Sequence, residues 1–175
     1  MTRNLLRHRH RRLPRAGFAL FELVVVILIM AIVGAIAAPR VANTIRHQRL
    51  DFASRRVMAD LRLARSQAIR DQANRRVAFS MTAQTYSLPE YTGPGAPYTV
   101  RLDADSFTGV RLDSVGYSSP PEVVFSRLGF PQAGGNIVLG DDVEQVVITI
   151  SATTGQPSRV FQSSPAAALE SVTPP

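Results

Sequence analysis

Few residues in this sequence have side chains that could catalyse a reaction or hold a metal. The 175 residues include no cysteine and no lysine. This composition excludes disulfides, thiolate metal sites, cysteine nucleophiles, Schiff bases and lysine-containing phosphate loops. A Ser-His-Asp arrangement needs a histidine, and beyond the basic N-terminal segment the chain has only His47. The sequence therefore predicts no enzymatic activity and no cofactor.

Two acidic clusters could offer oxygen ligands to calcium. One consists of Asp103 and Asp105, and the other of Asp141, Asp142 and Glu144. Neither cluster has the ligand spacing of a calcium-binding loop, so both are interpreted as solvated turns. No metal site is predicted.

Glu22 is the one charged residue inside a long apolar run. Residues 18–38 read FALFELVVVILIMAIVGAIAA. As a helix they would extend about 32 Å, enough to cross a bilayer core of about 30 Å. Residues 1–17 contain six arginines and no acid, which favours a cytoplasmic N-terminus. A carboxylate near the centre of such a helix is unfavourable by about 2.5–3.5 kcal/mol, and usually has a partner and a role.

Two ordinary interpretations explain this run poorly. A secretory signal peptide could end at the small residues Ala35-Ile36-Ala37, but its apolar region is usually only about 7–15 residues long. A twin-arginine signal at Arg11-Arg12 is weaker still, because no apolar residues follow promptly. A plain membrane anchor has the right length, but it leaves Glu22 unexplained.

The order of residues around Glu22 resembles the class III signal of type IV pilins and type II secretion pseudopilins. The matching features are Gly17-Phe18, Glu22, and an unbroken apolar run up to Pro39. The resemblance implies that prepilin peptidase cuts between Gly17 and Phe18 and that Phe18 is then N-methylated. It also implies that Glu22 pairs with the Phe18 amine of a neighbouring subunit, since an unpaired buried charge is costly.

Helical spacing returns after Pro39, which should kink or interrupt the helix because proline lacks a backbone N–H. The two parts could form one helix of about 55 residues, roughly 80 Å long, with a bend at Pro39. One face is marked by a 3-4-4-3-4 spacing, and Ile45, Phe52 and Ile69 should widen it. The spaced residues are Leu50, Ala53, Val57, Leu61, Ala64 and Ala68.

Most of the charge after residue 17 lies on this second helical part. Residues 46–76 hold nine arginines and three aspartates, whereas all residues after Gly17 hold 14 arginines and 13 acids. The arginines are interpreted as a solvated face near lipid headgroups, with one-turn pairs such as Arg56–Asp60. His47 is interpreted as a polar residue at the same level. Packing against acidic domains in a filament and binding to DNA remain alternatives. The candidate DNA or headgroup contacts are Arg46, Arg49, Arg55, Arg56, Arg62 and Arg65.

The remainder of the chain reads as short strands separated by glycine and proline. Loops are expected at residues 92–97, 103–107 and 116–121. Short, closely spaced strands predict antiparallel sheets, and two such sheets could pack as a small sandwich. The expected strands are Val77–Met81, Thr85–Leu88, Tyr98–Leu102, Val110–Leu112, Glu122–Ser126, Ile137–Leu139, Val143–Ser151 and Arg159–Gln162.

Three segments narrow the resemblance to the H-type minor pseudopilins and their FimT relatives, the GspH/FimT family. Residues 60–80 look like that family's helix-to-strand junction, residues 123–140 like its glycine-punctuated hairpin, and residues 146–160 like its closing hairpin. FimT-type relatives that bind DNA carry Gly-Arg-x-Arg after the final turn. Here Gly155 is followed by a single arginine, Arg159, and by Pro157, which weakens the DNA interpretation.

The resemblance implies an α+β, pilin-like subunit whose long N-terminal helix packs on an antiparallel sheet or sandwich. The expected segments are a cleaved leader (1–17), a transmembrane helix (18–38), an amphipathic periplasmic helix (39–75), a β-rich domain (76–163) and a flexible tail (164–175). The subunit would sit in the inner membrane as a single-pass protein, with its β-domain in the periplasm. Its expected partners are other major and minor pilins or pseudopilins, prepilin peptidase, the inner-membrane assembly platform and lipid. The implied role is in the tip or initiation complex of a type II secretion pseudopilus; the alternative is a type IV pilus subunit that binds DNA during uptake.

Overall fold

The computed structural model describes residues 16–117 and 119–164. Most of the expected leader and, apart from Ser164, the expected tail lie outside the described residues. The chain divides into two units, Met1–Ala42 and Asn43–Pro175, and each is described by itself.

Helix α1 runs from Ala16 to Arg70 and contains 55 residues, which confirms the expectation of one long helix. The helix passes through Pro39 without a break, so the expected interruption is absent; the expected kink stays a prediction. α1 ends at Arg70 rather than at residue 75. Gln72 adopts a positive φ of 51°, and its side-chain amide donates to the carbonyl of Ile69 over 2.7 Å. A left-handed residue terminates a helix and directs the chain into the following strand.

The second part of α1 buries the predicted face. All six spaced positions from Leu50 to Ala68 are at most 1% exposed. The expected widening is wrong, because Ile45, Phe52 and Ile69 are 42%, 59% and 42% exposed. Phe52 lies two residues after Leu50, about 200° around the helix. Polar side chains flank the buried stripe instead, namely Ser54, Asp60 and Gln67.

Eight strands follow α1, and each overlaps one of the eight predicted strands. Their bounds are β1 (Arg75–Ser80), β2 (Thr85–Leu88), β3 (Tyr98–Arg101), β4 (Arg111–Val115), β5 (Glu122–Phe125), β6 (Gly135–Gly140), β7 (Glu144–Ile150) and β8 (Pro157–Ser163). The described residues of the three expected loops lie outside the strands, and Asp105–Phe107 forms a 3-10 turn.

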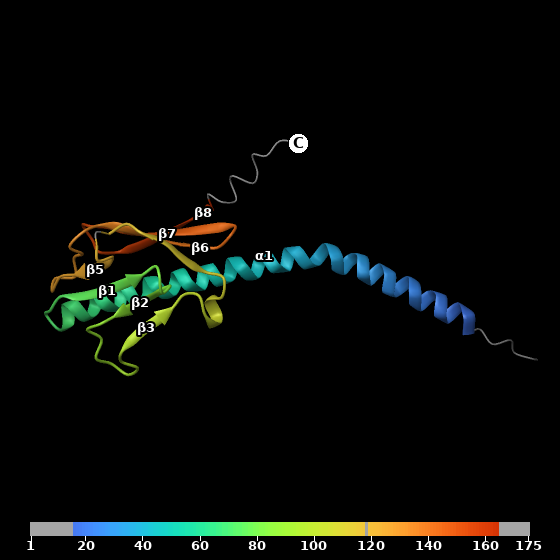
Figure 1. Ribbon diagram of the computed structural model, residues 1–175, viewed down its shortest axis with the longest axis horizontal. Helices are drawn as coiled ribbons and strands as arrows, with labels where there is room; N and C mark the ends of the chain where they lie inside the picture. The colour runs from blue at the N-terminus through green and yellow to red at the C-terminus, as the bar shows by residue number, and fades with distance from the viewer. Residues whose placement is uncertain (1–15, 118, 165–175) are drawn as a thin grey trace, which may run out of the picture. The chain divides into compact units, whose positions relative to one another are not determined.

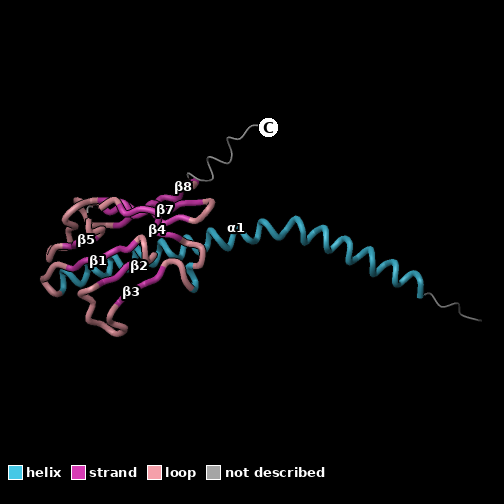
Figure 2. Tube along the Cα trace, in the orientation of Figure 1, coloured by secondary structure: helices cyan, strands magenta, loops and turns pink. Residues whose placement is uncertain are grey.

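The strands form two antiparallel four-stranded sheets. One has the order β3-β2-β1-β5 and the other β4-β6-β7-β8. In the second, β7 pairs with β8 along seven residues, from Glu144↔Ser163 to Ile150↔Pro157. Within the unit Asn43–Pro175, both sheets lie alongside the C-terminal part of α1 (Figures 1 and 2).

A single hydrophobic core joins the helix to both sheets. The buried stripe of α1 belongs to the same cluster as Val77 and Tyr86 of the first sheet and Ile137 and Ile148 of the second. In β7 every second residue on one face is buried, namely Val146, Ile148 and Ile150. The core therefore fixes which face of α1 meets the sheets and which face remains outside.

Candidate functional site

The residues expected to act in processing and assembly lie in the first turns of α1. Gly17, Phe18 and Glu22 are all helical. Glu22 is exposed, and its carboxylate makes no hydrogen bond or ion pair with another described residue. The adjacent apolar side chains Phe21 and Leu23 are 67% and 60% exposed. Cleavage at Gly17, methylation of Phe18 and an intersubunit partner for Glu22 remain predictions.

The apolar part of α1 is long enough and apolar enough to cross a membrane. It is the one such helix in the described part of the chain, and none of its most apolar window is buried. Apolar residues exposed on all sides of a helix require a nonpolar environment that this unit does not supply.

Aspartates or glutamates pair with five of the nine arginines in residues 46–76. Arg55 contacts Asp51 over 2.8 Å and Arg56 contacts Asp60 over 3.2 Å, each one helical turn away. The Arg56–Asp60 pair was predicted from this spacing and is confirmed. Further pairs join Arg70 and Arg75 to Asp71, and Arg76 to Glu90 and Glu122.

Asp60 is the centre of a polar cluster between α1 and the first sheet. It is 5% exposed and accepts a hydrogen bond from the Tyr86 hydroxyl over 2.5 Å. Arg56 donates to the carboxylate of Asp60 and, over 2.6 Å, to the Tyr98 hydroxyl. Burial and the neighbouring Asp60 raise the pKa of Tyr98 to about 12. The cluster satisfies a buried carboxylate and orients α1 on β2 and β3.

Arg159, the single arginine of the closing hairpin, faces α1. It forms an ion pair with Asp51 at 2.6 Å and donates to the Ser54 hydroxyl at 2.5 Å. Only 21% of its side chain is exposed. This arginine serves the packing of β8 on the helix and offers little to an external ligand.

His47 of α1 lies beside Glu144, a member of the second acidic cluster, where the helix packs on β7 and β8. The Nδ1 atom of His47 lies 2.6 Å from a carboxylate oxygen of Glu144, and its ring lies 5.0 Å from that of Phe161. Asp141 accepts hydrogen bonds from the backbone N–H groups of Val143 and Glu144, as an acid that closes a turn does. A headgroup-level position for His47 remains a prediction.

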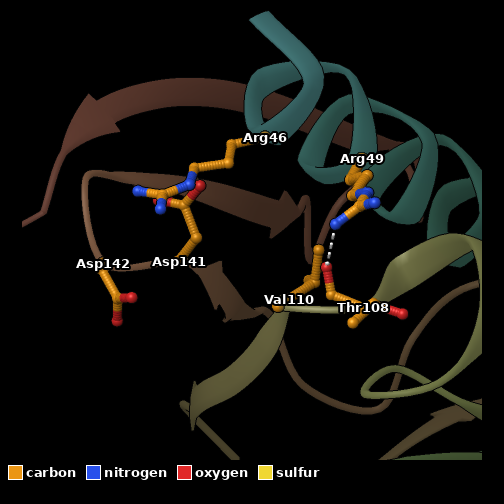
Figure 3. Close-up of a pocket in the computed structure, with 7 residues that line it drawn as sticks. Arg46, Arg49, Thr108, Val110, Asp141 and Asp142 are labelled. Carbon is orange, nitrogen blue, oxygen red and sulfur yellow. Dashed lines mark hydrogen bonds between the residues drawn. The ribbon is translucent and has the colours of Figure 1, made fainter. Parts of the chain in front are cut away.

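A pocket of about 230 Å³ lies between α1 and two loops, lined by both basic and acidic residues. From α1, Arg46 extends toward Asp141 and Arg49 toward Thr108 (Figure 3), and Asp142 also lines the pocket. Arg49 donates to the Thr108 carbonyl over 3.1 Å (Figure 3). Arg111 and, more weakly, Arg46 hold the pKa of Asp142 below its ordinary value. The positive charge predicted for this region is thus largely balanced locally.

No metal site is evident within the described ranges, 16–117 and 119–164. They contain no group of three or more histidine, aspartate and glutamate side chains placed to hold a metal. Asp103, from the first acidic cluster, pairs with Arg101 over 3.1 Å.

The turns that contain Gly129 and Gly155 both contact Arg65 of α1. The Nε atom of Arg65 donates to the carbonyl of Gly129 over 2.9 Å. A Cβ added at Gly155 would lie 2.6 Å from that same carbonyl oxygen and 3.3 Å from Arg65 Nε. Both glycines have positive φ, 80° and 66°, a conformation that glycine adopts without steric penalty. The 123–140 and 146–160 segments therefore touch each other as well as the helix, which sequence reasoning did not foresee.

An apolar helix half that is exposed, joined to a half that packs on two antiparallel sheets, is the architecture of a pilin-like subunit. The chain belongs to the GspH family, described as "Type II transport protein GspH", whose family model matches residues 53–154. It is a family of structural pseudopilins, and the match includes Arg65 and Gly129 and ends one residue before Gly155.

The same fold is found in a solved minor pseudopilin structure. The minor pseudopilin EpsH from the type 2 secretion system of Vibrio cholerae is similar with a TM-score of 0.50 and 12% identity, over 66% of this chain and 97% of that one. The type IV minor pilin FimU from Pseudomonas aeruginosa aligns with a TM-score of 0.47 and 16% identity, over 69% of this chain and 92% of the other. No curated protein sequence matches.

Proposed function

We propose that this protein is a minor pseudopilin of the tip or initiation complex of a type II secretion pseudopilus. The observation that carries the proposal is the GspH family match over residues 53–154, combined with an apolar helix half whose most apolar window has no buried residue. Its work is packing rather than catalysis. It forms a single-pass anchor in the inner membrane, and its β-domain faces the periplasm.

Processing by prepilin peptidase would prepare the subunit for assembly. Hydrolysis of the Gly17–Phe18 peptide bond removes the basic leader and leaves an α-ammonium on Phe18, which is then methylated. In a stack of apolar helices, the exposed carboxylate of Glu22 is available to the Phe18 amine of the next subunit. A charged pair in a low-dielectric setting would fix the stagger between neighbours, since loss of one partner costs several kcal/mol.

Intact mass of the membrane-extracted protein tests the processing step. The protein is expressed with and without prepilin peptidase, and a Gly17→Val variant is the matched control. We expect a chain that begins at methylated Phe18 only when the peptidase is present and Gly17 is intact. A chain that begins at Ala38 would instead mean ordinary signal cleavage and would contradict the proposal.

Secretion and assembly test the role itself. A strain lacking this protein should lose type II secretion and recover it with the wild-type chain, but not with Glu22→Ala at equal membrane levels. Unimpaired secretion in the deletion strain would contradict the proposal.

DNA uptake as a type IV minor pilin is the less supported alternative. Two of its six candidate arginines, Arg55 and Arg56, pair with aspartates, and Arg159 is held by Asp51. A salt titration of DNA binding by residues 47–175 distinguishes the two functions. Binding at physiological salt that weakens steeply as salt rises would favour uptake.

A further inference from the structure

The β5–β6 connection presents two large apolar side chains to solvent from a well-anchored turn. Leu128 and Phe130 are 65% and 47% exposed. The Gly129 N–H donates to the Ser126 carbonyl and the Ser126 N–H to the Phe130 carbonyl, each over 2.8 Å. Arg65 fixes the same turn through Gly129. The backbone that carries these two side chains is therefore anchored within the domain.

The exposed apolar surface continues onto α1. Gly129 packs directly on Ile69, because a Cβ added at Gly129 would lie 2.6 Å from Ile69 Cδ1. Ile69 is itself 42% exposed. Figure 1 draws this connection and the C-terminal end of α1 at the same end of the unit. Single exposed apolar residues are common, but a contiguous group of them marks an interaction site.

This apolar group is bordered by arginines that lack carboxylate partners. Arg62 and Arg127 are exposed, and neither guanidinium group forms an ion pair or hydrogen bond with another described residue. Arg65 is half-buried and bonds a backbone carbonyl rather than an acid. By contrast, eight arginines elsewhere in the described chain pair with aspartate or glutamate. They are Arg55, Arg56, Arg70, Arg75, Arg76, Arg101, Arg111 and Arg159.

We infer that these residues form a docking surface for an acidic, apolar-bearing segment of another protein subunit of the assembly. The docking surface consists of Arg62, Arg65, Ile69, Arg127, Leu128 and Phe130. The inference rests on the proposed function, because it assumes that neighbouring subunits are present. The partner's apolar side chains would cover Ile69, Leu128 and Phe130, and its carboxylates would neutralise Arg62 and Arg127.

The composition of the docking surface favours a protein over a nucleic acid. Single-stranded nucleic acid binds along a track of cations with aromatic platforms on which successive bases stack. Here the docking surface has two free guanidinium groups and a single aromatic ring, and its other apolar members are aliphatic. Arginine and buried apolar anchors of this kind are typical of protein interfaces.

Site-specific photocrosslinking of the full chain in its native membrane tests the docking surface. A photoreactive residue replaces Leu128, and Val160 is the matched control because it is 58% exposed but lies on β8. A third variant carries the same residue at Leu23, in the apolar half of α1. We expect Leu128 to crosslink to another subunit, at a segment containing aspartate or glutamate, and Val160 to crosslink at least about tenfold less.

The remaining outcomes overturn the inference in distinguishable ways. A crosslink from Leu23 to other pilin-like helices, with none from Leu128, overturns the docking surface and leaves the proposed function standing. No crosslink from either position overturns both. A crosslink from Leu128 to residues 165–175, to a second copy of this chain, or to nucleic acid assigns the surface to a different occupant and also overturns the inference, as does an equal yield from Val160.

Charge reversal tests the electrostatic part of the inference. Arg127→Glu should lower the Leu128 crosslink yield by about tenfold, whereas Arg55→Glu, with the same change in net charge, should leave it nearly unchanged. Reversing the crosslinked acidic residue of the partner to arginine should restore the yield in the Arg127→Glu background. Equal loss from both variants, or no rescue, would overturn a specific charge contact.

Discussion

Within α1, residues 20–36 and residues 50–68 are both rich in apolar side chains, but only the second group buries them. Met30 is 69% exposed, whereas Leu61 is fully buried. The first group is apolar on every face, and the second is apolar along one stripe that the chain's own sheets cover. The carboxylates of Asp60 and Glu22 differ in the same way. Asp60 has its partners within the chain, and Glu22 has none in the part of the chain described. Apolar or charged groups without internal partners indicate where interactions with other molecules are needed.

Removing the first group should have the largest effect and leave the second group intact. Residues 43–175 form their own unit, so this fragment should remain folded and stay in solution without detergent, while the full chain partitions into membranes. Sedimentation and circular dichroism measure both properties. A fragment that is unfolded would show that the two halves depend on each other.

A leucine deletion in each half should separate their contributions to stability. Leu61→Ala should lower the free energy of unfolding by about 2–5 kcal/mol, because it leaves a cavity in a packed core. Leu28→Ala, on the exposed half, should change it by less than about 0.5 kcal/mol. Urea unfolding followed by tyrosine fluorescence measures both in the full chain. Equal effects would contradict the contrast between the halves.

The turns that cover the second half can be tested with a matched glycine pair. Gly155 and Gly109 both have positive φ, but a Cβ meets a backbone oxygen at 2.6 Å only at Gly155. Gly109→Ala should cost about 1–2 kcal/mol from backbone strain alone, and Gly155→Ala about 1–3 kcal/mol more, because backbone must shift. Thermal unfolding of both variants checks the difference.

The two carboxylates should respond in opposite ways to neutralisation. Asp60→Asn should destabilise the helix–sheet unit by about 1–3 kcal/mol, because it disturbs a buried, fully bonded group. Glu22→Gln should leave unfolding unchanged and impair assembly with other subunits. Chemical denaturation and copurification from membranes are the two measurements. An assembly defect from Asp60→Asn at unchanged stability would break the distinction.

The smallest expected effect is a pH dependence at Asp51. Burial raises the pKa of this carboxyl, but Arg159 and Arg55 together hold it below its ordinary value. A depressed pKa contributes stability above the unfolded value of about 3.9, and this contribution is lost as the pH falls through the folded value. The melting-temperature difference between wild type and Asp51→Asn should therefore shrink as the pH falls from about 5 to about 3. A constant difference would show that Asp51 contributes through packing alone.

Local sequence patterns predicted much of the fold because its elements carry local signals. The spacing from Leu50 to Ala68 and the β-branched runs cut by glycine and proline identified the helix face and the eight strands. The same reasoning failed for Phe52. Its apolar side chain suggested burial, but its position about 200° around the helix from Leu50 places it on the exposed face. Sequence reasoning also missed contacts between distant positions, such as Asp60 with Tyr86 and Asp51 with Arg159, because nothing local specifies them.

The pairing of β8 with the helix bears on when this domain can fold. Arg159 and Phe161 of β8 contact Asp51 and His47 of α1. The strand and the helix segment that it contacts are therefore separated in sequence by most of the domain's length. Contacts between distant positions form late, after the entropy of closing a long loop has been paid. A chain that crosses a membrane from one end would keep the apolar stripe of α1 uncovered until its last strand had emerged. If the domain is exported as the proposed function requires, its folding would be complete only after β8 has crossed the membrane.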